Sequence, residues 1–207
     1  GQSVEYILNK LKDAGLSAMP GGGAEIFDSD IRKQICPDKC NAERWIKIHR
    51  TAHKLGIRSN ATMLFGHIEN RRNRLDHMLQ IKELQEETGG FDAFIPLLFK
   101  STNNQLSYLG EIGFVEIIKT FAVSRVVLNN IPHIKSYWPM LGKDLSQLTL
   151  LYGADDMDGT INNSTKIYSM AGSHANPEMS CDEIENMARE CGFIAIERDS
   201  FYNEVKK

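Results

Sequence analysis

The stretch Phe91-Asp-Ala-Phe-Ile-Pro-Leu97 is largely apolar and shows no alternation between polar and apolar residues. A strand of a half-exposed sheet would alternate, so this pattern predicts a parallel strand that is covered on both faces. Gly89-Gly90 precedes the strand, and the polar loop Ser101–Ser107 follows it. The longest apolar run, Ala93–Phe99, is too short to cross a bilayer, so we expect no membrane partner.

Outward from this strand, apolar residues recur at helical spacing in some segments and form short strand-like runs in others. The predicted helices are Val4–Ala14, Asp28–Ile35, Ala42–Leu55, Arg71–Glu87, Phe114–Asn129, Asp144–Leu151 and Cys181–Glu190. The other predicted strands are Ser17–Met19, Ile57–Phe65, Ile134–Trp138 and Phe193–Glu197, and Gly153–Thr160 is a predicted aspartate-rich loop. Strands and helices alternate at intervals of roughly 35 to 40 residues, which indicates parallel βα units.

The connections between these units are asymmetric. Helix-to-strand turns such as Leu55-Gly56-Ile57 are short, whereas the strand-to-helix loops are long and polar. This asymmetry is typical of a βα barrel whose site is built at the carboxyl ends of its strands. A complete barrel needs roughly 250 residues, and this chain has 207. We therefore predict an α/β fold, half of a TIM-type βα barrel over residues 1–160, with a C-terminal extension over residues 161–207 that packs on it.

Half a barrel leaves one edge of its sheet unpaired. We expect this edge to pair with a missing N-terminal half or with another chain. The chain starts with Gly1 in place of an initiator Met, which we interpret as the remnant of a cleaved tag rather than a natural start.

The composition narrows the function classes. Lys and Arg number 24 and Asp and Glu 27, which gives a net charge of -3. This balance argues against a basic nucleic-acid-binding surface. The start of the chain shows no signal-peptide pattern, so we expect a cytoplasmic protein that acts on a small molecule.

Polar residues at strand ends are the candidate binding residues. Glu25 follows the run Gly21-Gly22-Gly23, which lets a ligand approach the backbone closely. Asn60 and Thr62 lie two apart on one strand and therefore share a face, and His67 follows in the loop. The alternatives stay open: a flexible turn with a solvated carboxylate at Glu25, internal hydrogen bonds at Asn60 and Thr62, and a helix-start histidine at His67.

Two further groups of residues are weaker candidates. Asp158 and Thr160 end the aspartate-rich loop and are placed to contact a ligand hydroxyl, although a solvated acidic loop is the alternative. His49 and His53 are four apart on one predicted helix, but two histidines leave a metal under-coordinated. We expect these two histidines to lie on the surface of the helix.

Several strings resemble a radical S-adenosylmethionine (SAM) family of menaquinone biosynthesis. They are PGGGAEIFD (20–28), ICPDK (35–39), HRTAHKLGI (49–57), SNATMLFGHIE (59–69) and ETGGF (87–91). The segments SNAT (59–62), TKIYSMAG (165–172) and ERDSFY (197–202) favour its aminofutalosine synthase branch. The dehypoxanthine futalosine cyclase and deazaflavin synthase branches are the alternatives, and a non-catalytic half-barrel that pairs with another chain is a third.

The resemblance covers the C-terminal part of that family and implies the cofactors. The family's CxxxCxxC motif holds a [4Fe–4S] cluster, whereas here Cys36 and Cys40 are followed by Glu43. We expect no metal ligand in this chain and an inactive chain when it is alone. The implied reaction of the complete enzyme adds the deoxyadenosyl radical of cleaved SAM to a carboxyvinyloxy-benzoate, which gives aminofutalosine. Glu25, Asn60, Thr62, His67, Asp158 and Thr160 are the expected SAM and substrate contacts, with no individual catalytic role assigned.

Overall fold

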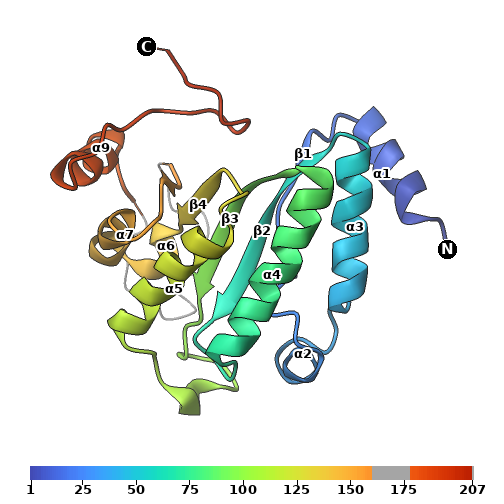
Figure 1. Cartoon of the computed structure of the whole chain (residues 1–207), viewed down its shortest axis with the longest axis horizontal. Coiled ribbons are helices and arrows are strands. Elements are labelled where there is room, and N and C mark those ends of the chain that lie inside the picture. Colours follow the sequence, from blue (N-terminus) through green and yellow to red (C-terminus); the bar gives the residue numbers. More distant parts are fainter. Residues whose placement is uncertain (160–177, 207) are drawn as a thin grey trace.

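Parallel strands form one sheet in the order in which they occur along the chain (Figure 1). The computed structural model describes residues 1–159 and 178–206. Within these residues the strands are β1 (Ala18–Met19), β2 (Arg58–Phe65), β3 (Phe91–Leu98), β4 (His133–Ser136) and β5 (Asp156–Met157). Each strand pairs in parallel with its neighbour, and β2 and β3 share the longest ladder.

Helices connect these strands and cover one face of the sheet, with α4 and α5 lying along β2 and β3 (Figure 1). The longer helices are α1 (Val4–Asp13), α3 (Ala42–Lys54), α4 (Arg71–Thr88), α5 (Phe114–Val127) and α9 (Cys181–Glu190). The shorter ones are α2 (Ser29–Ile35), α6 (Trp138–Leu141), α7 (Lys143–Leu150) and the 3₁₀ turn Ser107–Leu109. No helix of the described ranges is both long and apolar enough to traverse a membrane.

Side chains along β2 point alternately to the face of the sheet that packs under the helices and to the opposite face. Ala61, Met63 and Phe65 are fully buried and belong to the main core, which also contains residues of α4 and α5. Asn60, Thr62 and Leu64 therefore lie on the other face, which we call the inner face. In-register pairing with β3 places Ile95 and Leu97 on the inner face as well, and both are half-buried.

The apolar run of β3 is explained by this arrangement. Phe94 and Leu98 pack under the helices and are at most 3% exposed. Ile95 and Leu97 point to the inner face and are half-buried there. The absence of alternation therefore reflects an apolar inner face in addition to the helix-covered one.

The prediction of a C-terminal strand was wrong. Phe193–Glu197 begins with four consecutive apolar residues, yet it forms no strand, and Ile194 is 90% exposed. The last strand of the sheet is instead Asp156–Met157, inside the predicted aspartate-rich loop, where it pairs with β4. Residues 193–197 belong to none of the paired strands of the described structure, and an apolar run alone does not create a strand.

The surface position expected for His49 and His53 was also wrong. His49 is 3% exposed and stacks on Trp45 with 3.7 Å between ring centroids. The Ser59 hydroxyl lies between the two rings, 2.9 Å from His49 Nδ1 and 2.7 Å from His53 Nε2. Burial lowers the pKa of His49 to about 3 and that of His53 to about 4. The two histidines join α3 to the start of β2.

The described C-terminal residues pack beside the last strands. Trp138, Met179 and Met187 form a small buried cluster that joins α9 to α6, and α9 also contacts α7. Figure 1 shows α9 beside α7, at the end of the sheet opposite α1. The proposed boundary between barrel and extension, near residue 160, falls at the edge of the described residues and stays a prediction.

We predict that Gly21→Ala destabilises the chain by about 3 kcal/mol, because overpacking against rigid backbone is costly. A Cβ on Gly21 would lie 2.5 Å from Asn60 O and 2.9 Å from Ala61 C, and neither backbone atom moves without distorting β2. Urea unfolding of both proteins measures the difference. Gly22→Ala is the matched control, because a Cβ there meets nothing within 4 Å. Equal losses in the two variants would contradict the close approach of this loop to β2.

We predict an acid-sensitive fold, because burial also lowers the pKa of His77 to about 3. Well above pH 6.5, His49, His53 and His77 are neutral in both the folded and the unfolded chain. Below pH 6.5, the unfolded chain binds protons that the folded chain refuses until the pH approaches the folded-state pKa values. The free energy of unfolding therefore falls by about 1.4 kcal/mol per histidine for each pH unit.

Urea midpoints between about pH 7.5 and about pH 5 measure this loss, since carboxylates contribute mainly below that window. His77→Gln removes one titrating ring and keeps a donor for Thr62 O, which lies 3.0 Å from His77 Nε2. Its pH dependence should be shallower by about one proton. A free energy of unfolding that does not change over this window would contradict buried neutral histidines.

Candidate functional site

The loop after β1 runs along the backbone of β2. The Thr62 hydroxyl donates to Gly21 O at 2.7 Å, and the Leu64 N–H donates to Glu25 O at 2.7 Å. Trp45 Nε1 donates to Gly22 O at 3.2 Å from α3. These bonds hold the glycine-rich loop against the carboxyl half of β2, where ligand sites of parallel βα folds form.

Glu25 has a strained backbone at the end of this loop. Its φ is 46°, in the left-handed region that residues other than glycine rarely adopt. Such strain costs on the order of 1–3 kcal/mol and is concentrated at functional sites. The Glu25 carboxylate forms an ion pair with Lys39, whose side chain is 50% exposed, whereas that of Glu25 is 16% exposed. The Glu25 carboxylate is thus largely shielded from solvent, whereas its partner Lys39 lies at the surface.

Arg32 organises the same loop, and the sequence analysis missed it. Its guanidinium donates to the carbonyl oxygens of Gly23, Ala24, Ile26 and Cys40. The side chain is buried, with the residue 5% exposed. A basic residue in the last turn of a short helix is common, so the sequence carried no signal that this one points inward.

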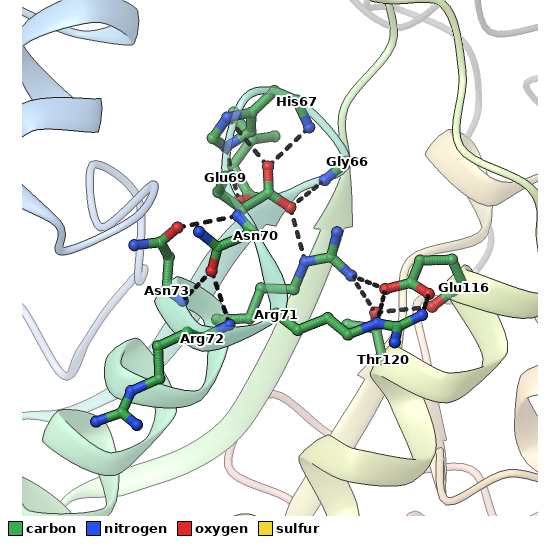
Figure 2. Close-up of polar contacts among 11 residues, drawn as sticks. Gly66, His67, Glu69, Asn70, Arg71, Arg72, Asn73, Glu116 and Thr120 are labelled. Carbon is green, nitrogen blue, oxygen red and sulfur yellow. Dashed lines mark hydrogen bonds and ion pairs between the residues drawn. The ribbon is translucent and has the colours of Figure 1, made fainter.

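A second turn, residues 66–69, follows the carboxyl end of β2 (Figure 2). The Glu69 carboxylate accepts hydrogen bonds from the N–H groups of Gly66 at 2.7 Å and His67 at 2.8 Å. Arg74 Nε donates to the same carboxylate at 2.7 Å. Burial alone would raise the pKa of Glu69, but the Gly66 N–H, His67 and Arg74 together lower it. Glu69 is therefore an ionised, buried anchor for the turn.

Arg74 extends this anchor to α5. Its Nη1 donates to Glu116 Oε1 and Thr120 Oγ1, both at 3.0 Å. Arg71 adds two hydrogen bonds to the same glutamate, at 3.0 and 2.7 Å. Asn70 caps α4 by accepting from the N–H groups of residues 72 and 73 (Figure 2). The turn after β2 is thus tied to the starts of two helices.

His67 faces into the protein. Its side chain is fully buried, with Nε2 3.1 Å from Leu64 O and Nδ1 3.2 Å from Glu69 Oε2. Burial lowers the pKa of His67, and the Glu69 carboxylate opposes that effect. The Leu64 N–H therefore donates to the backbone oxygen of Glu25, and the Leu64 carbonyl oxygen lies within hydrogen-bond distance of the His67 ring. The structure brings these two predicted site residues together around one backbone position.

The other predicted site residues are spread along the sheet. Asn60 is half-buried and lies three residues into β2, at an irregularity in its pairing with β3. The Thr62 hydroxyl donates its hydrogen bond to Gly21 O in the loop after β1. Asp158 follows β5, three strands away from β2, so it lies apart from Glu25 and His67. Thr160 lies outside the described residues.

The described residues contain no group of three His, Cys, Asp or Glu side chains that could hold a metal ion. Cys36 is buried after α2, and burial raises the pKa of its thiol, which disfavours the thiolate that binds iron. The described residues therefore do not fit an iron–sulfur cluster.

We predict that Glu69→Gln destabilises the chain by about 3–5 kcal/mol, the cost of breaking a buried ion pair. Glutamine offers one oxygen where the carboxylate receives Gly66, His67 and Arg74, so a donor loses its partner and Arg74 loses its counter-charge. Asp76→Asn is the control, because its pair with Arg72 is largely exposed and should cost little. Thermal and urea unfolding compare the two, and similar stabilities would show that the anchor is dispensable.

Comparison with known proteins places the chain. A family model described as the CofH/MqnC C-terminal region matches residues 88–207. The aminodeoxyfutalosine synthase of Thermus thermophilus is 48% identical over 97% of this chain and 55% of its own length. The enzyme of that name from Streptomyces coelicolor is 40% identical, over 100% of this chain and 56% of its own length. A 5-amino-6-(D-ribitylamino)uracil–L-tyrosine 4-hydroxyphenyl transferase of Methanopyrus kandleri is 39% identical, over 100% and 57%.

The solved structure of methylornithine synthase is similar in fold, with a TM-score of 0.66 over 93% of this chain and 56% of that one, at 15% sequence identity. This similarity and the parallel sheet confirm the predicted α/β partial barrel. The chain spans about half the length of the curated relatives it matches. By the family model that covers residues 88–207, and by relatives up to 48% identical over nearly all of it, the chain belongs to the CofH/MqnC family.

Proposed function

We propose that this chain is the C-terminal half of a radical SAM enzyme that makes aminodeoxyfutalosine from a carboxyvinyloxy-benzoate in menaquinone biosynthesis. The observation that carries the proposal is the 48% identity to an aminodeoxyfutalosine synthase over 97% of the chain. The site geometry supports it, because the polar groups lie at the carboxyl end of β2, where βα barrels bind their ligands.

SAM fits the loop after β1. A ligand ammonium or hydroxyl can replace Lys39 on the Glu25 carboxylate, since Lys39 is half exposed and Glu25 is held by its own backbone bond to Leu64. Asn60 is half-buried on the inner face of β2 and offers an amide to the same space. Thr62 and His67 keep the two loops in place through backbone contacts.

The cluster belongs, in this proposal, to the part of the enzyme outside the chain. When bound, the cluster and SAM supply the deoxyadenosyl radical for addition to the substrate. This chain contributes the wall that orients SAM and substrate and excludes water from them. Without the cluster-bearing part we expect the chain to be inactive.

The open edge of the sheet is where that part would join. β1 has two residues and pairs only with β2 in the described structure. A barrel removes such an edge by pairing it with another strand. We propose that strands of the N-terminal half pair with β1 and continue the barrel.

One other function has a specific observation in its favour. Relatives named 5-amino-6-(D-ribitylamino)uracil–L-tyrosine 4-hydroxyphenyl transferase are 38–40% identical to the chain. A tyrosine-using reaction of the deazaflavin branch is therefore the second candidate. The cyclase branch and the non-catalytic half-barrel have no comparable support.

We predict that Glu25→Gln lowers turnover by roughly 10- to 100-fold in the polypeptide that joins this chain to its N-terminal half, because a charge-assisted hydrogen bond to SAM is lost. Product formation is measured by mass spectrometry with the carboxyvinyloxy-benzoate and, separately, with tyrosine. The apparent KM for SAM should rise in the variant. Circular dichroism verifies that the variant is folded.

Glu83→Gln is the matched control, since Glu83 is exposed on α4 and lies far from the loop after β1 along the chain. Unchanged turnover and KM in Glu25→Gln would remove Glu25 from the site. Conversion of tyrosine, but not of the benzoate, would select the second candidate function. Failure of the separately expressed halves to associate would contradict pairing at β1.

A further inference from the structure

A chain of buried charges lies on the inner face of β4 and β5, away from the loops of β1 and β2. In-register pairing places Lys135 beside Asp156, and Asp158 follows two residues later on the same side. Lys135 is 8% exposed, and its Nζ lies 3.0 Å from Asp158 Oδ1 and 3.6 Å from Asp156 Oδ2. A lysine this buried is held in place by its two carboxylates.

The end of the chain folds back onto this group. Residues 198–204, which we call the C-terminal hook, are closed by an antiparallel bridge between Arg198 and Glu204. Arg198 donates two hydrogen bonds of 2.7 Å to the two oxygens of Asp156. The Tyr202 hydroxyl donates to the same carboxylate at 3.2 Å, and its ring stacks on His133 at 4.4 Å.

Because the hook binds Asp156, Lys135 is available to pair with Asp158. Asp156 already receives three hydrogen bonds from the hook, so Lys135 lies closer to Asp158 than to Asp156. Trp138 Nε1 donates to Asp158 O at 3.2 Å and fixes its backbone. Through Asp156 and Lys135, the hook thus determines where the Asp158 carboxylate lies.

Within the described residues, one oxygen of Asp158 has no partner. Oδ2 is buried and accepts no hydrogen bond from any residue that the structure describes. The pKa of Asp158 is raised by burial and lowered by Lys135, with a net rise. A buried oxygen without a donor is costly and rare in native proteins. Rotation about χ2 of aspartate is soft, so this oxygen can turn toward a ligand on the side chain's exposed edge.

The charge balance decides what the ligand offers there. Asp156 and Asp158 are matched by Lys135 and Arg198, so a charged ligand group would unbalance a buried set. A neutral hydroxyl supplies the missing donor without adding charge. On β3, next to Lys135 in the sheet, the half-buried Ile95 and Leu97 present apolar surface for the body of a ring.

We propose that Asp158 binds a neutral hydroxyl group carried by a ring-shaped ligand, and that Arg198 of the C-terminal hook is a positioning residue for it. The proposal rests on the proposed function only in placing a ligand at the carboxyl ends of the strands. The hydroxyl is either phenolic or from a sugar ring, and both present the same donor to the carboxylate.

The experiment titrates the chain with 3-hydroxybenzamide and with benzamide, which differ by one hydroxyl, and follows the amide NMR signals of Asp158 and Gly159. We expect about tenfold tighter binding of the hydroxylated probe, the value of one hydrogen bond to a charged group. Methyl β-D-ribofuranoside is titrated in parallel and identifies a sugar source if it binds and the phenol does not. If neither the phenolic nor the sugar probe shows hydroxyl-dependent binding, the proposal is overturned.

Asp158→Asn should lower the tenfold preference severalfold, because the neutral amide replaces a charge-assisted hydrogen bond with a neutral one. Asp144→Asn, on the exposed side of α7, should retain it. If Asp158→Asn does not fold, Lys135→Met tests the same site by removing the cation that orients the carboxylate. An undiminished preference in a folded Asp158→Asn protein overturns the assignment.

The positioning role has its own readout. Arg198→Ala frees Asp156 to take Lys135, so the ratio of the two probe affinities should fall at least threefold, with Tyr202→Phe giving a smaller fall. Arg189→Ala, exposed on α9, is the control. A merely structural role would weaken both probes equally and leave the ratio unchanged, which would refute positioning. Because these titrations need neither SAM nor the N-terminal half, they fail independently of the proposed reaction.

Discussion

The alternation of side chains along β2 is the constraint on which the rest of the structure depends. Ala61, Met63 and Phe65 are 0% exposed because α4 and α5 pack against them together with β3. A slip of one residue would turn these side chains to the inner face and expose the core. The same register fixes Asn60 and Thr62 on the opposite face. Packing on one side therefore determines which groups are available for chemistry on the other.

Backbone contacts carry this constraint to the loops. Gly21 lies so close to β2 that no Cβ fits, and Leu64 binds Glu25 through its N–H and His67 through its carbonyl. Glu69 then fixes the turn after β2 to α4 through Arg74. The candidate site is thus an extension of one strand, and its geometry is as rigid as that strand. Such rigidity suits a wall that must orient ligands rather than close over them.

The sequence was informative where local chemistry decides the structure. The helices α1, α3 and α9 begin at the predicted residues, where Ser3, Asn41 and Ser180 cap them. The strands β2 and β3 also appear within a residue or two of their expected bounds. Prediction from the sequence failed where contact with a distant segment determines the local structure. The pattern at residues 193–197 found no strand to pair with, whereas Asp156–Met157 pairs with β4 despite its turn-like composition.

The candidate site shows the same division. Glu25 and His67 were predicted as site residues because they follow predicted strands. Arg32 and Arg198 were missed because their roles depend on carbonyls and carboxylates distant in sequence, which no local pattern reveals. Lys135 carried a usable signal, a lysine within a short buried strand, since burying lysine requires partners.

The separation of Glu25 from Asp158 bears on what the sheet can bind. These residues follow β1 and β5, which are four strand spacings apart, or about 19 Å along the sheet at the usual spacing. Curvature toward a barrel shortens the direct distance, but a single small group cannot contact both carboxylates. Two polar ends with Ile95 and Leu97 between them are suited to two ligands that meet over an apolar surface. One ligand at β1 and β2 and a second, hydroxyl-bearing ligand at β4 and β5 would satisfy both ends, which is the arrangement that a reaction between two bound molecules requires.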